Sequence, residues 1–245
     1  VERSRGLGDV YKRQVYEGLE VGDRFAFLAK NCTEMAIMYY AASKVGAVPV
    51  PLNYRLADQE WAYIINDSEA KLIIVKGNEY SDRINQISSE LKNVKKYISI
   101  SLDNSAEKFQ DFYDWLSDSS NEKPTLKIHE NDDVYQMYTS GTTGHPKGAV
   151  LLQRNVAANI RQYLNSLTLP RPSRTLLVAP MYHAAAMINM CGCIAIGGTI
   201  VIQEDFIPQD VVDCLANEKI THTVLVPAMI QACLVSVPNL SLIHI

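Results

Sequence analysis

One stretch, Tyr138–Gly148, combines residue types that suit the binding of a polyphosphate. Its sequence, YTSGTTGHPKG, holds three glycines, four Ser or Thr hydroxyls and one lysine. Glycines let the main chain turn and aim its N–H groups at an anion, hydroxyls donate hydrogen bonds or reach a metal ion, and lysine adds a compact positive charge. A plain connection between two strands has no use for so many donors, although a flexible hairpin stays the structural alternative.

Two other loop chemistries do not fit these residues. The phosphate loop of P-loop nucleotide hydrolases needs a Gly-Lys-Ser/Thr run, whereas two residues separate Gly144 from Lys147 here. A serine nucleophile elbow needs Gly-x-Ser-x-Gly, and Tyr138 stands where the glycine before Ser140 would be. The stretch therefore indicates phosphate binding of another kind.

The elements around this stretch alternate between short apolar runs and helical patterns. The apolar runs predict strands over 24–29, 47–51, 71–75, 97–100, 134–138, 149–152, 175–179 and 222–226. Spacing and composition predict helices over 35–45, 58–65, 84–91, 155–167 and 211–216. Asn31, with Glu34 three residues on, offers an N-cap for the first helix, and Pro49 and Pro51 predict a sheet edge. This alternation predicts an α/β fold with mostly parallel sheets, in which ligands lie at the carboxyl ends of strands, as the loop after Tyr138 would.

Composition is typical of an ordinary globular protein, with 47% hydrophobic and 20% charged residues. The net charge is −4 without a basic cluster, which argues against a nucleic-acid partner. Five cysteines at irregular spacings favour reduced, buried thiols over a zinc site or disulfides.

Two segments, residues 184–202 and 101–124, differ in composition from the rest of the chain. Residues 184–202 carry no charge and reach membrane-spanning length, but Asn189, the Gly197-Gly198 pair and a β-branched end favour a buried helix, a glycine turn and a buried strand. A membrane span is the alternative. Residues 101–124 are polar and acidic, which predicts a surface excursion with a short helix.

The two ends of the chain encode each other. Residues 9–14 can be written as GAT GTG TAT AAG AGA CAG, and the reverse complement of that DNA translates to residues 240–245. Because this DNA resembles the transposase-end adapter of sequencing libraries, residues 1–14 and 240–245 are interpreted as adapter-derived scars. The chain is then expected to be a fragment of a longer reading frame, and its arginine-rich start no targeting peptide.

Residues 138–148 resemble the signature Y-T-S-G-T-T-G-x-P-K-G of the AMP-forming adenylating enzymes, which include acyl-CoA synthetases, adenylation domains of peptide synthetases and luciferases. Residues 46–53 (GAVPVPLN), 180–183 (PMYH) and 226–228 (VPA) are similar to three further motifs of that family. One departure follows the loop, where the family's His-x-Asn is replaced by Gln-Arg-Asn at 153–155. The other follows the second motif, where alanines replace a glycine.

The resemblance covers most of residues 15–239 and implies part of the large N-terminal α/β domain of such an enzyme. It implies a first α/β subdomain over 15–130, followed over 131–239 by the phosphate-loop segment and the truncated start of a second subdomain. The family's later motifs, including a ribose-binding aspartate and a C-terminal domain with its catalytic lysine, are absent from the chain. The polypeptide alone is therefore expected to be inactive.

The chemistry implied by the resemblance is a two-step ligation. A carboxylate attacks the α-phosphate of ATP to give an acyl-adenylate and pyrophosphate, and coenzyme A then takes the acyl group. The residues expected to hold the β- and γ-phosphates are Thr139, Ser140, Gly141, Thr142, Thr143, Gly144 and Lys147. Lys147 is also expected to be catalytic, and Thr139 to contact Mg²⁺. His183 is expected near the carboxylate, as a gate or electrostatic partner, whereas His145 occupies the variable position and is expected to be solvated.

The acyl substrate is less narrowly indicated. The apolar character of residues 175–203 and the alanines after His183 resemble medium- or long-chain fatty acyl-CoA synthetases. An amino-acid or aryl-acid adenylation domain and a non-catalytic nucleotide-binding module stay open as alternatives. The expected partners are a small carboxylic acid, ATP and CoA. The expected location is the cytoplasm, with attachment to a membrane surface as an alternative.

Overall fold

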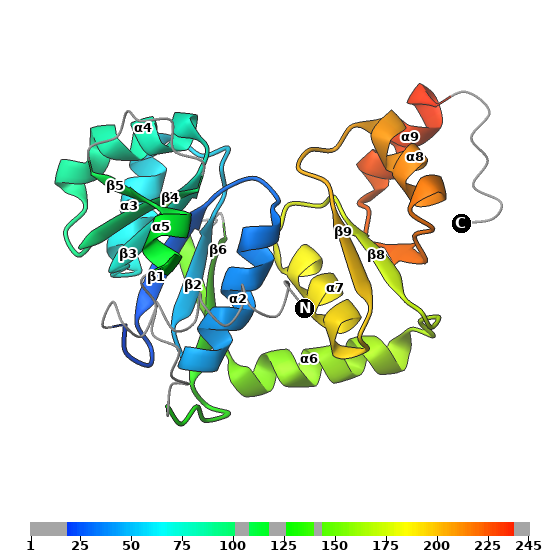
Figure 1. The fold of residues 1–245 in the computed structure, drawn as a ribbon, viewed down its shortest axis with the longest axis horizontal. Helices are drawn as coiled ribbons and strands as arrows, with labels where there is room; N and C mark the ends of the chain where they lie inside the picture. The colour runs from blue at the N-terminus through cyan, green and yellow to red at the C-terminus, as the bar shows by residue number, and fades with distance from the viewer. Residues whose placement is uncertain (1–18, 101–107, 118–125, 140–143, 238–245) are drawn as a thin grey trace. The chain divides into compact units, whose positions relative to one another are not determined.

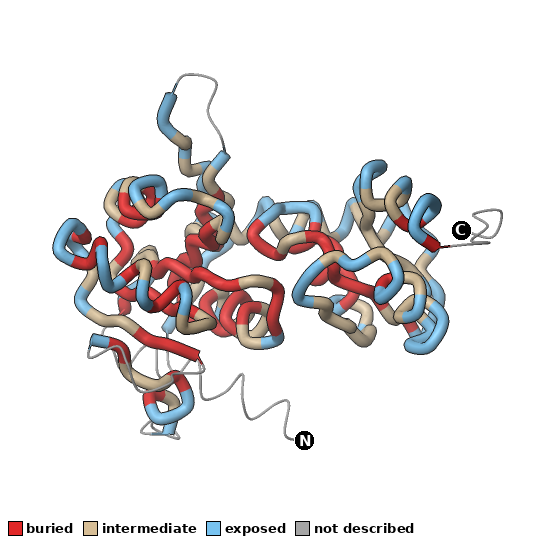
Figure 2. Tube along the Cα trace, turned by 90° about the horizontal axis from the view of Figure 1, so that it is seen from above, coloured by how far each residue is buried: buried red, intermediate tan, exposed pale blue. Residues whose placement is uncertain are grey.

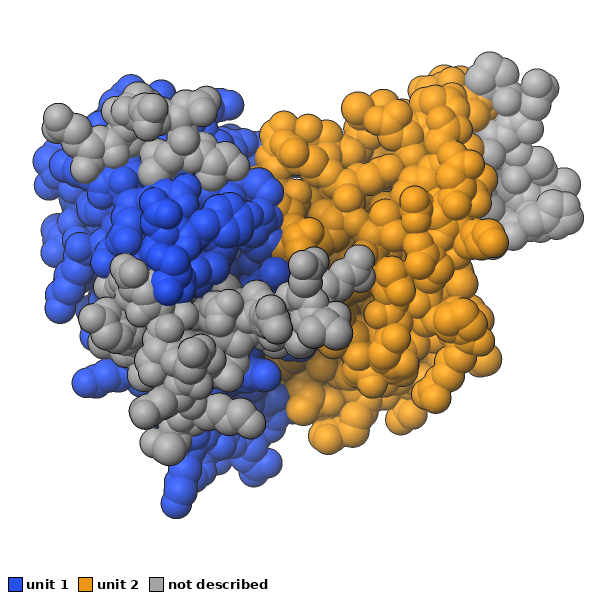
Figure 3. Space-filling view, in the orientation of Figure 1, with its two compact units in different colours: residues 1–29, 34–155 blue, residues 30–33, 156–245 orange. Residues whose placement is uncertain are grey.

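The computed structural model describes residues 19–100, 108–117, 126–139 and 144–237. The chain divides into two compact units (Figure 3): unit 1 comprises residues 1–29 and 34–155, and unit 2 comprises residues 30–33 and 156–245. Four residues from the N-terminal part of the sequence, Lys30–Thr33, thus belong to unit 2. The subdomain boundary expected between residues 130 and 131 stays a prediction.

A five-stranded parallel sheet forms the centre of unit 1, with its strands in the order β2-β1-β3-β4-β5 (Figure 1). The strands are β1 (Arg24–Leu28), β2 (Val48–Leu52), β3 (Leu72–Lys76), β4 (Lys96–Ile100) and β5 (Phe109–Asp111). The helices are α2 (Thr33–Val45), α3 (Asp58–Asp67), α4 (Asn78–Ile87), the 3-10 turn η1 (Ser88–Glu90) and α5 (Phe112–Ser117). The predicted α/β class with mostly parallel sheets is confirmed.

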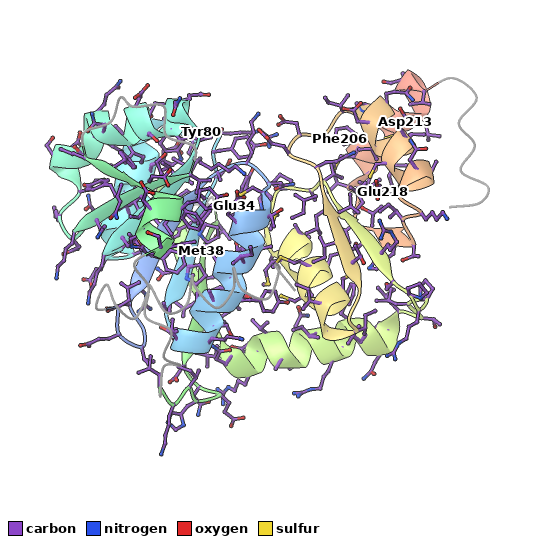
Figure 4. All side chains as sticks on the ribbon, viewed as in Figure 1. Glu34, Met38, Tyr80, Phe206, Asp213 and Glu218 are labelled. Carbon is purple, nitrogen blue, oxygen red and sulfur yellow. The ribbon has the colours of Figure 1, made fainter. Side chains whose placement is uncertain are left out.

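Helices cover this sheet on both faces because alternate strand residues point to opposite sides. On one side, Phe25 and Phe27 share an interior space with Met38 of α2. On the other, the alternate residues of the strands join a core cluster with Trp61 of α3 and Tyr80 of α4. Figure 4 labels Met38 and Tyr80, and Figure 2 colours the buried residues red, among them nearly all residues of β1, β2 and β3.

Strand β2 lies at the edge of the hydrogen-bonded sheet, as its prolines predict, and pairs only with β1 among the described strands. Pro49 and Pro51 are alternate residues, so both missing N–H donors fall on one side of the strand. All five residues of β2 are nevertheless buried, because β6 (Asp133–Thr139) packs alongside it.

The loop after Tyr138 does not connect parallel strands. It joins β6 to β7 (Lys147–Leu152), and the two strands form an antiparallel pair of their own. The expectation that this loop lies at the carboxyl end of a parallel sheet is therefore wrong. The physical reason is the length of the connection: residues 140–146 can close a hairpin, whereas a parallel crossover needs a dozen residues or more.

Two other local expectations in the N-terminal half are corrected. Helix α2 begins at Thr33, and the Asn31 side chain is engaged elsewhere instead of capping it. The acidic segment 101–124 contributes more than a surface helix. Its described residues include β5 and α5, and both Phe112 and Trp115 are buried. The aromatic residues decide this outcome, because burying their rings outweighs the polar character of their neighbours.

Unit 2 is built on a second parallel sheet, with strand order β10-β8-β9. Helix α6 (Gln153–Ser166) leads into it from unit 1. Its further elements are β8 (Arg174–Leu177), α7 (Ala184–Ala195), β9 (Thr199–Ile202), α8 (Pro208–Asn217), β10 (His222–Thr223) and α9 (Pro227–Ser236). Its core cluster joins Leu176 and Val178 to Val211 of α8 and Cys233 of α9, with Phe206, labelled in Figure 4, packed against it.

The uncharged segment 184–202 folds as a helix, a turn at Gly197 and a strand, as predicted. Strand β9, expected to be buried, is only half-buried because it lies at the edge of its sheet. Among the described residues, no helix has both the length and the apolar character needed to cross a membrane. The five cysteines are free thiols, and four of them are buried as expected, whereas Cys214 is half-buried.

Candidate functional site

The ends of the candidate phosphate loop face each other across the β6–β7 hairpin. Thr139 is the cross-strand partner of Lys147, and Tyr138 is the partner of Gly148. Thr139 and Lys147 are both exposed, and no carboxylate among the described residues pairs with Lys147. A hydroxyl and an ammonium group therefore stand side by side at the mouth of the loop, both open to an anion.

Position 148 needs a glycine because side chains of the partner strand β6 fill the space next to it. A Cβ atom at this position would lie 2.5 Å from Nε2 of Gln136 and 2.8 Å from Cζ of Tyr138. Both side chains come from the same face of β6, since they are two residues apart. The absence of a side chain at Gly148 leaves the room in which Gln136 and Tyr138 meet.

The Tyr138 hydroxyl is held between two groups. It donates to Oδ2 of Asp67 at 2.6 Å and accepts from Nε2 of Gln136 at 3.0 Å. The amide oxygen of Gln136 in turn accepts from Nε of Arg24 at 3.0 Å, and Arg24 pairs with Asp133 at 2.7 Å. Burial first, and then the bond to Asp67, raise the pKa of Tyr138 well above its ordinary value, so the phenol stays protonated.

The remaining loop residues are described only in part. Ser140, Gly141, Thr142 and Thr143 lie outside the described residues, so the structure says nothing about their predicted role. Gly144 has φ +110°, a conformation that favours glycine. His145 is exposed, as expected of a solvated residue, yet its ring stacks on Tyr63 with 4.8 Å between centroids and 20° between planes.

A magnesium ion is implied by the resemblance, and the donor set at the loop can be tested for it. Among the residues that the structure describes, no group of three or more His, Cys, Asp or Glu is placed to hold an ion. The exposed hydroxyl of Thr139 is a hard oxygen donor of the kind that Mg²⁺ accepts beside phosphate and water. The residues therefore fit an ion that arrives with a polyphosphate.

The second predicted site residue, His183, lies in unit 2 at the start of helix α7. It is the N-cap residue of that helix, with extended backbone, and its side chain is exposed. Its N–H bonds the Pro180 carbonyl at 3.0 Å, its carbonyl accepts from Met187, and its ring lies 4.5 Å from that of the buried Tyr182. The turn before α7 thus presents the imidazole outward.

Asn31 holds this turn, a role that sequence reasoning missed. Its side chain is 6% exposed, and Nδ2 donates to the carbonyls of Ala179 at 3.0 Å and Gln203 at 3.1 Å. Its Oδ1 accepts from the N–H of Met181 at 2.7 Å. All four residues belong to unit 2. The only signal in the sequence was an Asn after a buried strand, which is equally typical of a helix cap.

The predicted site residues thus fall into two sets. The structure pairs Thr139 with Lys147 in unit 1, where Gly144 also lies, and it places His183 in unit 2. The supporting residues that were not predicted are Asp67 and Tyr63 of α3 for the first set and Asn31 for the second.

Comparison with known proteins gives a family match. The model of the family described as "AMP-binding enzyme" matches residues 14–242. Long-chain-fatty-acid–CoA ligase FadD13 of Mycobacterium tuberculosis is 31% identical over 216 residues, which cover 87% of this chain and 41% of that protein. Feruloyl-CoA synthase of an Amycolatopsis species is 30% identical, with 88% of this chain and 40% of that protein covered.

Solved structures agree with these relatives. The inhibitor-bound N-terminal domain of FACL13 from Mycobacterium tuberculosis is similar with a TM-score of 0.84 and 27% identity, covering 95% of this chain and 57% of that one. The chain spans about two fifths of the length of the curated relatives that it matches.

Proposed function

The chain belongs to the AMP-binding enzyme family, and from this premise we propose that the complete protein is an AMP-forming carboxylate–CoA ligase. In the first step, a carboxylate oxygen bonds to the α-phosphorus of ATP, and the bond to the bridging oxygen breaks to release pyrophosphate. In the second step, the CoA thiol loses its proton to water, its sulfur bonds to the acyl carbon, and the bond from that carbon to the phosphate oxygen breaks to release AMP. A cytoplasmic location is part of this proposal.

The observation that carries the proposal is the pairing of Thr139 with Lys147 at the mouth of the glycine-rich hairpin. In the first step, negative charge grows on the departing pyrophosphate. A lysine and main-chain donors at the loop would meet that charge as it develops, which would lower the barrier more than it strengthens ground-state binding. Gly144 and the predicted donors Ser140, Gly141, Thr142 and Thr143 would complete the cradle.

Thr139 is the residue that would hold a magnesium ion, through its exposed hydroxyl. When bound, such an ion neutralises charge on the phosphate oxygens. Lys147 contributes a second positive charge from the opposite strand, and its compact ammonium group can follow the phosphates as they separate.

His183 would serve the carboxylate end of the reaction. Its exposed imidazole at the start of α7 and the small side chains of Ala184 and Ala185 that follow it support a role beside a bulky acyl group. We infer a medium- or long-chain fatty acid as the substrate, in keeping with the name of the FadD13 relative. The feruloyl-CoA synthase relative keeps an aryl acid as the second candidate.

The test is ATP–pyrophosphate exchange by the complete protein with a panel of fatty, aryl and amino acids. Exchange that depends on a fatty acid supports the proposal. Exchange that depends on an aryl or amino acid instead assigns that acid as the substrate class. Nucleotide binding without exchange identifies a non-catalytic module.

Within that assay, Lys147→Ala is expected to slow exchange by about 10²-fold, with a much smaller change in the KM of the carboxylate. Lys95→Ala is the matched control, because Lys95 is equally an exposed lysine but lies on the connection before β4. Equal rates for Lys147→Ala and the unmodified protein would refute the role of Lys147.

A further inference from the structure

We propose that helix α3 positions the phosphate loop at both of its ends, through Asp67 on Tyr138 and through Tyr63 on His145. The inference rests on the proposed function, since it takes the loop to bind the phosphates of ATP. Asp67 and Tyr63 are positioning residues, because they act on the loop and not on the substrate.

The first contact fixes the start of the loop. Tyr138 directly precedes Thr139, and its hydroxyl donates to Asp67 over 2.6 Å. The same hydroxyl accepts from Gln136, which the guanidinium of Arg24 holds in place. Each hydrogen bond in this chain restricts the orientation of the next side chain. Together they hold both the position and the direction of the end of β6.

The second contact fixes the end of the loop. His145 lies two residues before Lys147, and its ring is stacked on Tyr63 at 4.8 Å. A nearly parallel stack at this distance holds an exposed side chain by the area it covers and by ring electrostatics. Pro146, between His145 and Lys147, has a fixed φ and transmits this placement to the lysine.

The two contacts come from one rigid element. Tyr63 and Asp67 are four residues apart on α3, so they are neighbours on the same face of the helix. On its other side, α3 buries Trp61, Ile64 and Ile65 in the core of unit 1. The rings of Tyr63 and Tyr138 also pack against that core cluster. Because both strand ends of the hairpin contact one packed helix, Thr139 and Lys147 lose less conformational freedom when they bind phosphate.

The main test compares two aspartates of the same helix in the complete protein: Asp67, which accepts a hydrogen bond from Tyr138, and Asp58, which pairs with Arg83. Asp67→Ala and Tyr138→Phe are each expected to raise the KM of ATP about fivefold in pyrophosphate exchange, with the KM of the carboxylate unchanged. Because both remove the same bond, the double variant is expected to be no worse than the more affected single one. The matched control is Asp58→Ala, which breaks the 2.7 Å pair with Arg83 at the opposite end of α3 and should leave both KM values unchanged.

The other end of the loop is tested by a conservative pair. His145→Phe keeps a ring on Tyr63 and is expected to keep the KM of ATP, whereas His145→Ala is expected to raise it about twofold to threefold. Equal effects of the two substitutions would show that His145 does not act by stacking on Tyr63, and would overturn this half of the proposal.

A readout that needs no activity separates this inference from the proposed function. In the present chain, Asp67→Ala is expected to speed amide hydrogen exchange in β7 (Lys147–Leu152), and Asp58→Ala is expected to leave it unchanged. Equal exchange in both variants, or additive effects in the double variant, would overturn the positioning role. A complete protein without pyrophosphate exchange would instead overturn the proposed function, and the β7 amides would still decide whether α3 holds the hairpin.

Discussion

The two candidate motifs are held in place by different chemistry. In unit 1, the ends of the candidate phosphate loop are held by contacts at the surface, since Asp67 and His145 are exposed. In unit 2, the turn before His183 is held by the buried amide of Asn31. Surface contacts are replaced by water at small cost, whereas an unsatisfied buried backbone group bears its full desolvation cost. The loop can therefore be altered without unfolding its unit, and the turn cannot.

The largest effect is expected from Asn31→Ala. It leaves the carbonyls of Ala179 and Gln203 and the N–H of Met181 without their partner, which should destabilise unit 2 by about 2–4 kcal/mol. Hydrogen exchange of peptides that cover residues 173–203 is the measurement. The protein has two tryptophans, and because Trp61 and Trp115 both lie in unit 1, their fluorescence in urea should change little.

Asn66→Ala is the matched control for that comparison. Asn66 also bonds two backbone groups, the Glu90 carbonyl and the Lys92 N–H, but it does so near the surface. Its loss is expected to cost less than about 1 kcal/mol, read from tryptophan fluorescence. Similar losses for Asn31→Ala and Asn66→Ala would mean that burial does not distinguish the two regions.

An intermediate effect is expected from Gly148→Ala. The new methyl group would meet Gln136 and Tyr138, and displacing them should cost unit 1 about 1–2 kcal/mol in urea unfolding followed by tryptophan fluorescence. The cost is bounded because both clashes are with side-chain atoms and not with the backbone. Adding Gln136→Ala should restore part of the stability, and a double variant less stable than Gly148→Ala alone would show that the clash is not the cause.

The smallest effect is expected from pH, and its sign differs between the units. Burial lowers the pKa of His222 in unit 2 below its ordinary value of 6.5, so its contribution is present above pH 6.5 and is lost as pH falls. Burial and Asp67 raise the pKa of Tyr138 in unit 1, so its contribution is present below pH 10 and is lost as pH rises further.

Each pH effect is expected to be below about 1 kcal/mol. It is measured as the difference between the chain and a variant that does not titrate, His222→Gln in acid and Tyr138→Phe in alkali. Hydrogen exchange follows unit 2, and tryptophan fluorescence follows unit 1. Acid loss in His222→Gln equal to that of the unmodified chain would show that this histidine does not set the acid limit.

The elements were largely predictable, because each follows from local spacing. The run at 24–29 became β1, the helical spacing of Ile84 and Ile87 became α4, and the uncharged segment 184–202 became a helix, a turn and a strand. The errors arose where the length of a connection or the place of a strand in its sheet decided the outcome. Strand β5 forms because β4 offers it an edge, and β9 is half-buried because it is itself an edge.

The sequence by itself indicated the kind of chemistry that we propose, since glycines, hydroxyls and one lysine in eleven residues suit a polyphosphate. It also determined the family, because the same residues make up the motif. Only the tertiary structure decided what holds these residues in place. Asp67 reaches Tyr138 across 71 positions of sequence and Asn31 reaches Met181 across 150. No local pattern encodes such pairs, because they form only when sheet and helix packing bring the two positions together.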